Sequence, residues 1–472
     1  MNHITKKIFL QALICPTYGW RLRSGAIISD LSICDIFRME EGKAVGRRSR
    51  ELYPDGIFIQ GETREEITAS IRKSLEGASS GVFFEVPFTV GNFHARADII
   101  VKNDTTWDLI EVKSSLNQRE EFIDDMAYTT LVARESGYSP HRIYLMLLDR
   151  NYRLGMSVEN LFQTIDCTGE VNQKVEEFST LMSDIDRLTG SSSEPEPVLK
   201  FDCKRCDQFG QCIGKGHDAH IFLIPKISQK KFQELCSVGV FSIHDIPDHI
   251  SLTPNQQRFV ECVKCRSIHI EDSIHDRIQG FERPVYYLDF ETMSTALPLY
   301  ENIAPYEKIP TQYSIHVCDT TGNVVDHREY IADPYSYRPR DLVEKLIQDL
   351  GDSGSVVTYS SFERTIISAL QIKNPDLSDR LGSILERIVD LEPCIKCIQH
   401  PEFLGRTSIK VVLPVLVSDL SYEDLEISDG NTAMVTFAMA ASGMMGAEEW
   451  ERKRAALLEY CKRDTYAMVK LH

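Results

Sequence analysis

Two carboxylates and a lysine at strand spacing stand in the stretch ADIIVKNDTTWDLIEVKSS. Apolar, β-rich runs flank the polar residues 103–106, and this pattern predicts an antiparallel hairpin. A turn at the middle of that loop sets Asp98 opposite Glu111, while strand alternation points Glu111 and Lys113 the same way. Carboxylates hold Mg²⁺ or Mn²⁺, and a lysine can orient a water that attacks phosphorus. The stretch therefore predicts a metal-dependent nuclease site; a surface hairpin with a salt-bridged E-x-K pair is the alternative.

A second acidic set lies in the C-terminal half of the chain. The apolar run in RPVYYLDFETMS ends in Asp289 and Glu291, which share one face of a predicted buried strand. Near the end of the chain, LLEYCKRDTYAMV places Tyr460 and Asp464 four residues apart, on one face of a predicted helix. Local spacing brings the members of each pair together, but only the fold can join the two pairs.

Four cysteines form a third candidate site. Cys15 stands near the start of the chain, and Cys203, Cys206 and Cys212 follow in FDCKRCDQFGQC with C-x2-C-x5-C spacing. This pattern resembles the iron–sulfur staple of RecB-type nucleases, which implies a [4Fe–4S] cluster that ties the two ends of a domain together. A four-cysteine Zn²⁺ site is one alternative. In the second alternative, Cys15 is a small core residue and the remaining three cysteines bind no metal.

The segments around the hairpin carry the same resemblance, which implies a restriction-endonuclease-like (PD-(D/E)xK) fold. ITKKIFLQALICPTYGW resembles the opening helix of RecB-like nucleases, and GKAVGRRSRELYPDG resembles the next helix, without the histidine that many relatives carry. VFFEVPF, with Glu85 as a secondary candidate, resembles the strand before the catalytic hairpin. The helix after the hairpin departs from the family, because Thr129 and Leu131 stand where relatives have Gln and Tyr.

The C-terminal acidic set resembles the DEDDy exonucleases of the ribonuclease H-like fold. The resemblance implies that four carboxylates hold two divalent ions and that Tyr460 orients the attacking water. The middle carboxylate of the family follows an aromatic residue after a strand. SVVTYSSFERTII fits this position with Glu363 in place of the usual Asp, and Asp390 in RIVDLEP is a secondary candidate. A ribonuclease H-like scaffold without catalysis is the alternative.

Taken together, the two halves resemble a bacterial family of unknown function that joins a RecB-like iron–sulfur nuclease to a ribonuclease H-like exonuclease. YYLDFETMSTALPLY, HPEFLGRTSIKVVLPVL and SYEDLEISDG are among the segments that carry this match. The resemblance implies an α/β protein in three parts. These are a PD-(D/E)xK domain with its cysteine staple over residues 1–216, a helical connector over 217–280 and a ribonuclease H-like domain over 281–472.

Length and composition agree with this organisation. The 472 residues suffice for two cores, and 42% of them are hydrophobic. No apolar run reaches the roughly 18 residues that a membrane-spanning helix needs, and no secretory leader is visible, so we expect a cytoplasmic protein without a membrane partner. The 13 cysteines, without a compact framework, favour reduced thiols and metal over disulfides. The chain stops inside a helical pattern at His472, as expected of a truncated gene product.

The net charge of −18 argues against a protein that simply coats nucleic acid. It does not exclude a nuclease, because a local basic stripe can coexist with an acidic remainder. The first fifty residues hold nine Lys and Arg against four Asp and Glu, including Arg47, Arg48 and Arg50. We expect a nuclease that hydrolyses phosphodiester bonds of DNA or RNA, with DNA favoured as the partner. The alternative is an iron–sulfur scaffold that binds nucleic acid without cleaving it.

Overall fold

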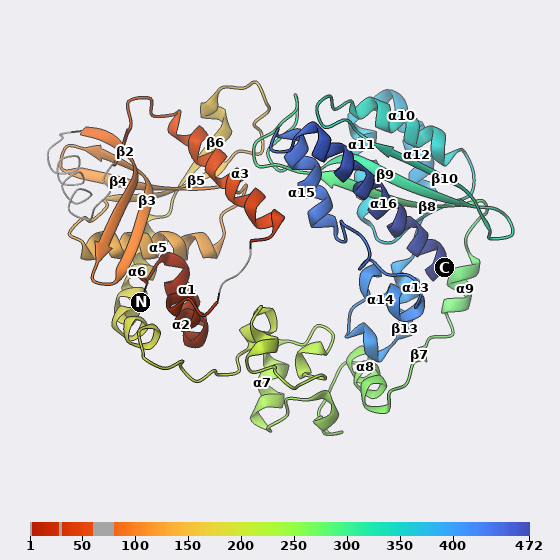
Figure 1. The fold of residues 1–472 in the computed structure, drawn as a ribbon, viewed down its shortest axis with the longest axis horizontal. Coiled ribbons are helices and arrows are strands. Elements are labelled where there is room, and N and C mark those ends of the chain that lie inside the picture. Colours follow the sequence, from red (N-terminus) through yellow and green to blue (C-terminus); the bar gives the residue numbers. More distant parts are fainter. Residues whose placement is uncertain (1, 28–30, 60–79) are drawn as a thin grey trace. The chain divides into compact units, whose positions relative to one another are not determined.

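The chain forms two compact units, each built on its own mixed β-sheet with helices packed against it (Figure 1). The structure is a computed structural model that describes residues 2–27, 31–59 and 80–472. Unit 1 comprises Met1–Ile213 and Thr295–Glu307, and unit 2 comprises Gly214–Ser294 and Lys308–His472. The prediction of an α/β protein is confirmed at this level, and the three-part division stays a prediction. No helix within the described ranges is both long and apolar enough to cross a membrane.

Six strands form the sheet of unit 1, in the spatial order β1-β2-β3-β4-β5-β6. Their bounds are β1 Ile57–Phe58, β2 Ser80–Val90, β3 Phe93–Asn103, β4 Thr106–Lys113, β5 Arg142–Leu148 and β6 Phe162–Asp166. β2, β3 and β4 form an antiparallel meander, β5 runs parallel to β4, and β6 returns antiparallel to β5. The meander contains the predicted hairpin. Asn103 pairs with Thr106 and Ile99 pairs with Ile110, so the predicted register is confirmed.

Helices cover the sheet of unit 1 and build its core. Their bounds are α1 Lys6–Ile14, α2 Pro16–Ser24, α3 Ile33–Arg50, α5 Glu120–Glu135 and α6 Thr168–Thr189, with short helices η2 Val158–Leu161, η3 Phe201–Arg205 and η4 Phe209–Gln211. α5 packs on β2 and β3, while α1 and α6 pack on α5. The rings of Phe9, Tyr128 and Phe178 meet in this layer, with the Phe9 centroid 5.0 and 5.3 Å from the other two. α3 packs against β4, and a capping box between Ser32 and Asp35 fixes its start.

Five strands form the main sheet of unit 2, in the spatial order β10-β9-β8-β11-β12. Their bounds are β8 Val285–Met293, β9 Ile309–Cys318, β10 Val324–Ile331, β11 Ser355–Thr358 and β12 Ile388–Asp390. β8, β9 and β10 are antiparallel neighbours, whereas β11 runs parallel to β8 and β12 runs parallel to β11. A separate two-stranded sheet pairs β7 His269–Ile270 with β13 Ile398–Gln399.

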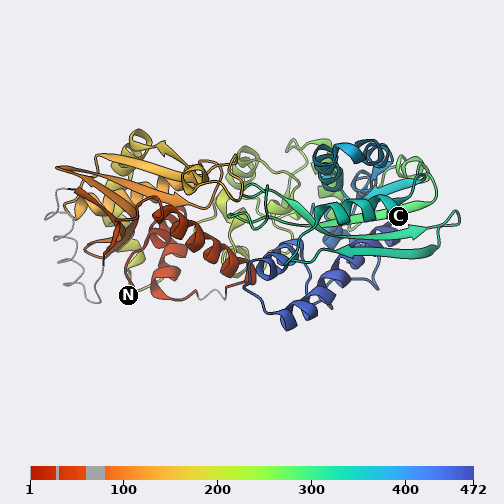
Figure 2. The same cartoon turned by 90° about the horizontal axis from the view of Figure 1, so that it is seen from above.

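The two faces of β8 differ, because its side chains alternate. Leu288 and Phe290 point into a core shared with α10, α11 and α12, while Val285 and Tyr287 belong to a core shared with Met468 of α16. Asp289 and Glu291 follow on the α16 side, and Figure 2 shows α15 and α16 together on one side of the sheet.

The helices of unit 2 are η5 Ile221–Leu223, α7 Gln229–Ser237, η6 Ile243–Asp245, α8 Pro254–Cys265, α9 Ile274–Gln279, α10 Pro339–Leu350, α11 Phe362–Lys373, η7 Pro375–Leu377, α12 Ser378–Glu386, α13 Glu392–Ile395, η8 Pro401–Phe403, α14 Ile409–Leu416, α15 Gly430–Ala441 and α16 Ala447–Leu471.

The segment Thr295–Glu307 follows β8 in sequence but belongs to unit 1. Within that unit, the Tyr306 hydroxyl donates to the carbonyl of Ser114 at 2.8 Å. The backbone N–H of Ala296 donates to the carboxylate of Glu41 on α3. Thr295–Glu307 thus contacts both α3 and the end of β4.

Gly354, the residue before β11, provides a test of the packing in unit 2. Its φ is +85°, and a Cβ at this position would lie 2.0 Å from the carbonyl oxygen of Pro284. Gly354→Ala should therefore lower the free energy of unfolding by on the order of 2–3 kcal/mol. Gly443→Ala is the matched control, because its φ is +75° but nothing lies within 4 Å of the added Cβ. Equal shifts of the urea midpoint for the two variants would contradict this packing.

Candidate functional site

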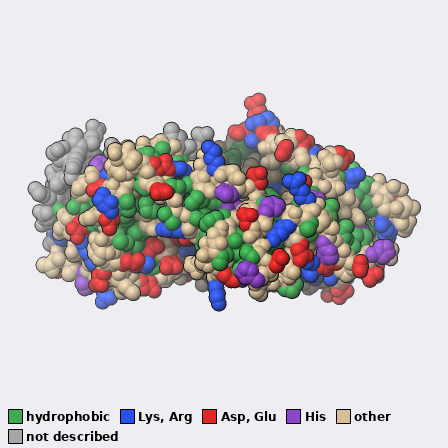
Figure 3. All heavy atoms as spheres, turned by 90° about the horizontal axis from the view of Figure 1, so that it is seen from below, with side chains coloured by type: hydrophobic (Ala, Val, Ile, Leu, Met, Phe, Trp, Pro, Cys, Tyr) green, Lys and Arg blue, Asp and Glu red, His purple; other side chains and the backbone are tan. Residues whose placement is uncertain are grey.

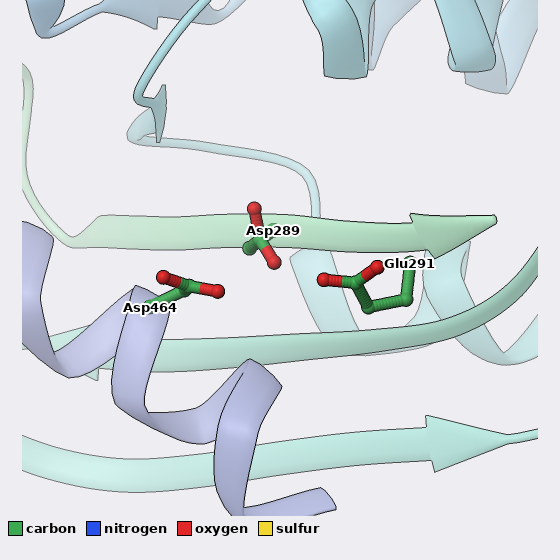
Figure 4. A group of neighbouring side chains, drawn as sticks. All are labelled: Asp289, Glu291 and Asp464. Atoms are coloured by element: carbon green, nitrogen blue, oxygen red, sulfur yellow. The ribbon is translucent and has the colours of Figure 1, made fainter. Parts of the chain in front are cut away.

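Asp289, Glu291 and Asp464 form an acidic triad in unit 2. One carboxylate oxygen of each lies within 4.8 Å of those of the other two. Asp289 and Glu291 extend from β8 and Asp464 extends from α16, and the three carboxylates point toward one another (Figure 4). The fold therefore joins the two predicted pairs. Asp289 and Glu291 are half-buried and Asp464 is buried, so the cluster keeps partial access to solvent.

Burial raises the pKa of every member of the acidic triad, and neighbouring carboxylates add to the shift at Asp289 and Glu291. Burial is the largest cause for Asp289, followed by the charges of Asp464, Glu363 and Glu291. The pKa of Glu291 rises for the same reasons, with Lys410 opposing the shift. Burial raises the pKa of Asp464 to about 6 against hydrogen bonds from two tyrosines. Such a set holds its negative charge only with a compensating cation, and a divalent metal ion supplies one.

Glu363 stands beside the acidic triad rather than in it. It occupies the first turn of α11, is 4% exposed, and its Oε2 has no hydrogen-bond partner among the described residues. Burial raises its pKa to about 8, with Asp390 and Asp464 adding to the shift. Asp390 lies at the end of β12 and has a buried Oδ1 that also lacks a described partner. These oxygens without partners suit a position next to a cation.

Tyr460 lies one turn before Asp464 on α16 and hydrogen-bonds to it. The ammonium of Lys410 donates to the Tyr460 hydroxyl at 2.9 Å and lies 4.7 Å from the centre of its ring. Tyr422 donates a short hydrogen bond to Asp464 Oδ1. A Cβ on Gly430, at the N-terminus of α15, would lie 3.8 Å from the Tyr460 hydroxyl and 3.9 Å from Glu291 Oε2. The start of α15 therefore closely approaches the acidic triad.

Sequence analysis did not single out Lys410, Tyr422 or Gly430. Each lies in a segment that carries the family resemblance, but no local spacing links these residues to β8 or α16. Lys410 comes from α14, whereas Tyr422 and the N-cap of α15 follow in the next loop. The only sequence signal for these residues was their position within segments that carry the family resemblance.

The first predicted site lies on the meander of unit 1. Asp98 on β3 and Glu111 on β4 directly adjoin the paired residues Ile99 and Ile110. Glu85 on β2 lies between Phe84 and Val86, which pair with β3 on either side of Asp98. The N–H of Val112 donates to Asp98 Oδ2 at 2.8 Å. Burial and the charge of Glu111 raise the pKa of Asp98 to about 7. Glu85 has a φ of 54° and forms ion pairs with Arg50 and Arg96.

Two ammonium groups neutralise Glu111. Lys6 from α1 lies 2.8 Å from Glu111 Oε1, and Lys113 lies 3.1 Å from the same oxygen. Both lysines also pair with Asp125 of α5. Burial opposes the charge of Glu111, but the two lysines outweigh burial and lower its pKa to about 2. Glu111 Oε2 is buried without a described partner, so it remains free to join Asp98 at a metal ion.

Sequence analysis did not assign Lys6 or Asp125 to this site. The signals were a lysine in the predicted opening helix and an acidic residue in the helix after the hairpin. Thr129 and Leu131, which stand where relatives have Gln and Tyr, are buried within α5 at 1% exposure each. They therefore belong to the core.

Three of the four predicted cluster cysteines line one cavity. Cys15 separates α1 from α2, and it lines a cavity of about 400 Å³ with Cys203 and Cys206. Burial is the main reason that the pKa of Cys203 is raised, and Cys15 and Cys212 add to the shift. Among the described residues, no three of these thiols lie within 4.8 Å of one another. A tetrahedral zinc site spaces its sulfurs by about 3.8 Å, given the usual Zn–S length.

Comparison with known proteins matches part of the chain. A family model described as a domain of unknown function (DUF2779) matches residues 286–408, which include Asp289, Glu291, Glu363 and Asp390. An uncharacterized protein of Mycoplasma pneumoniae, the MG366 homolog, is 28% identical over 210 residues, or 40% of this chain and 32% of that protein. The uncharacterized protein UU173 of Ureaplasma parvum is 24% identical over 240 residues, or 45% of this chain and 34% of that protein. The matches thus cover about a third of the length of these distant relatives.

The raised pKa values of the acidic carboxylates predict how stability depends on pH. Folding favours protonation of Glu363 and Asp464, so their contribution to stability is greatest at low pH and falls as pH rises through the raised values of about 8 and about 6. With a chelator present, wild-type protein should therefore lose stability between about pH 5 and about pH 8, and Mg²⁺ should restore it at the higher pH.

Asp289→Asn removes one of the repelling charges, so it should reduce this loss of stability and the gain from Mg²⁺. Glu386→Gln on the exposed surface of α12 is the control and should behave like wild type. Thermal unfolding at both pH values measures the effect. A Mg²⁺ response that is identical in wild type and Asp289→Asn would refute metal binding by the acidic triad.

Proposed function

We propose that this chain is a nuclease that hydrolyses phosphodiester bonds of nucleic acid with Mg²⁺ or Mn²⁺. The observation that carries the proposal is the acidic triad, whose carboxylate oxygens lie within 4.8 Å of one another. Oxygen ligands at this spacing suit hard divalent cations. A bound ion of this kind polarises a phosphoryl oxygen and lowers the pKa of a water molecule.

The sheet order of unit 2 supports a ribonuclease H-like fold for this site. The order β10-β9-β8-β11-β12, with β8 central and β11 and β12 parallel to it, is the arrangement expected of that fold. Asp289 and Glu291 then occupy the first strand and Asp464 the last helix, as in the DEDDy exonucleases that the sequence resembles. The DUF2779 match covers β8 but ends before α16, so the role of Asp464 rests on geometry and resemblance.

The residues of this chain then have distinct roles. Asp289, Glu291 and Asp464 would hold the metal. Glu363, whose charge raises the pKa of Asp289 and Glu291, would bind a water of the metal ion from beside the triad. Lys410 holds the Tyr460 hydroxyl through a hydrogen bond, so this hydroxyl has a fixed position from which to orient a water or a phosphate oxygen. Tyr422 fixes the Asp464 carboxylate in the same way.

Unit 1 supports a second metal site of the PD-(D/E)xK type. Asp98 and the free Oε2 of Glu111 would hold the ion, and Lys113 would orient the attacking water. One observation favours the alternative of a nucleic-acid scaffold for this half. Lys6 and Lys113 already balance the charges of Glu111 and Asp125 without a metal ion.

The cysteine set fits an iron–sulfur cluster as a structural element of unit 1. Cys15, Cys203 and Cys206 line a cavity with room for a cluster, and Cys212 is near enough to raise the pKa of Cys203. The choice of [4Fe–4S] over Zn²⁺ rests on the resemblance of the C-x2-C-x5-C spacing to the RecB-type staple. Such a cluster would join the region after α1 to the residues after α6.

Nuclease assays on single-site variants test the proposed function. Asp289→Asn should reduce Mn²⁺-dependent, end-directed digestion of labelled DNA by at least about 100-fold, because even outer-shell partners of a metal contribute up to that much. Lys113→Ala, in the Asp289→Asn background, should abolish the remaining cleavage. Glu386→Gln and Lys7→Ala are matched controls on exposed surfaces and should retain activity. If the wild-type protein cleaves neither DNA nor RNA with Mn²⁺, the nuclease proposal is wrong and the alternative of a nucleic-acid-binding scaffold remains.

Anaerobic purification tests the cluster. The wild-type protein should be brown and contain iron, and Cys203→Ala should lose both the colour and part of its thermal stability. Cys34→Ala is the control, because Cys34 lies on α3 outside the cysteine set. Stoichiometric zinc without iron would replace the cluster with a zinc staple.

A further inference from the structure

A basic cavity adjoins Asp98 in unit 1. Its volume is about 380 Å³, and α3 forms one wall while β2, β3 and β4 form the other. Lys43, Arg47 and Arg50 line it from α3, and Arg96 lines it from β3. We call this space the α3 cavity. Asp98 is itself one of the lining residues, so a ligand bound in the α3 cavity would lie next to the predicted catalytic carboxylate.

The α3 cavity has more positive than negative groups. Its four cationic side chains face two carboxylates, Glu85 and Asp98, and Lys43 also pairs with Glu40 at 2.6 Å. Glu85 is shared between Arg50 and Arg96 at 3.3 Å each, and Arg47 has no ion-pair partner among the described residues. This excess contrasts with the net charge of −18 and with the face drawn in Figure 3, where Lys and Arg are scattered among Asp and Glu. A concentration of cations in an acidic protein indicates an anionic ligand.

Two glycines keep the helix wall of the cavity open. Gly42 and Gly46 line the cavity one turn apart on α3. A Cβ on Gly42 would meet nothing within 4 Å, and a Cβ on Gly46 would meet only the end of the Arg50 side chain at 3.8 Å. The packing of unit 1 therefore does not require glycine at either position. Relative to alanine, each glycine in a helix interior lowers helix stability by about 1 kcal/mol. We infer that this loss is offset by a function, because the bare backbone lets a ligand approach the helix closely.

We propose that the α3 cavity binds a backbone phosphate of the nucleic-acid strand, next to the phosphate cleaved at Asp98 and Glu111; this inference rests on the proposed function. Guanidinium groups match phosphate oxygens with paired hydrogen bonds, and Lys43 adds a point charge. Arg47 makes the principal contact, because it is the cavity cation without a described ion-pair partner. The glycine wall lets the sugar–phosphate chain lie close to the α3 backbone.

Binding of a fluorescent single-stranded oligonucleotide, measured in a chelator to prevent cleavage, tests the cation. Arg47→Gln should weaken binding and reduce the slope of log affinity against log salt by about 0.7, the value for one phosphate contact on a single strand. Arg48→Gln is the matched control on the same helix, because Arg48 pairs with Glu51 and does not line the cavity. Equal effects of the two substitutions would overturn the proposal.

The glycine wall gives a second and independent test. Gly46→Leu should raise or maintain the melting temperature, because leucine favours helix, and should weaken oligonucleotide binding because its side chain fills the cavity. A purely structural role for Gly46 predicts a lower melting temperature instead. A variant that is as stable as wild type and binds the oligonucleotide equally well would overturn the proposal.

Two further arms identify the ligand. An oligonucleotide with uncharged methylphosphonate linkages should bind wild type and Arg47→Gln equally, because the phosphate charge is absent. If inorganic phosphate stabilises wild type through Arg47 while the oligonucleotide does not bind, the cavity is a site for small phosphates and the strand proposal is wrong. These readouts do not depend on cleavage. If Arg47→Gln loses binding and wild type shows no nuclease activity, the proposed function fails and the phosphate site stands.

Discussion

The close approach of like charges between β8 and α16 is the constraint that organises unit 2. Two unit charges 4.8 Å apart repel by on the order of 3–4 kcal/mol at the effective dielectric constant of a protein surface. Asp289, Glu291 and Asp464 form three such pairs when all are ionised, so the folded protein must bind protons or a cation there. Lys410 is the cation that contacts this region, and it opposes the raised pKa of Glu291 and Asp464. The surrounding hydrogen bonds from Tyr422 and Tyr460 hold Asp464 in place despite this repulsion.

In unit 1, lysine side chains balance the charges of the carboxylates. Glu111 and Asp125 are balanced by the ammonium groups of Lys6 and Lys113, so this site is close to neutral without metal. A metal ion between Asp98 and Glu111 therefore gains less from charge neutralisation than one at the acidic triad. This difference makes the acidic triad the stronger evidence for metal chemistry.

The parts of this structure that sequence predicts are local. The turn near Asp104 and the alternation of apolar residues determine the register of the hairpin, and strand alternation places Asp289 beside Glu291. The meeting of Asp464 with β8 depends on how α16 packs, and resemblance rather than spacing indicated it. Lys410 and Tyr422 act across tertiary contacts for which no sequence period exists. The assignment of Thr295–Glu307 to unit 1 is of the same kind, since the contact of Tyr306 with Ser114 joins residues 192 positions apart.

Anomalous scattering from crystals soaked with Mn²⁺ tests directly whether the acidic triad binds a divalent metal ion. We expect an anomalous peak within coordination distance of carboxylate oxygens from Asp289, Glu291 and Asp464, and its loss in crystals of Asp464→Asn. Ordered crystals of the wild-type protein that show no Mn²⁺ at these three residues, or show it only elsewhere, would rule out a metal site at the acidic triad.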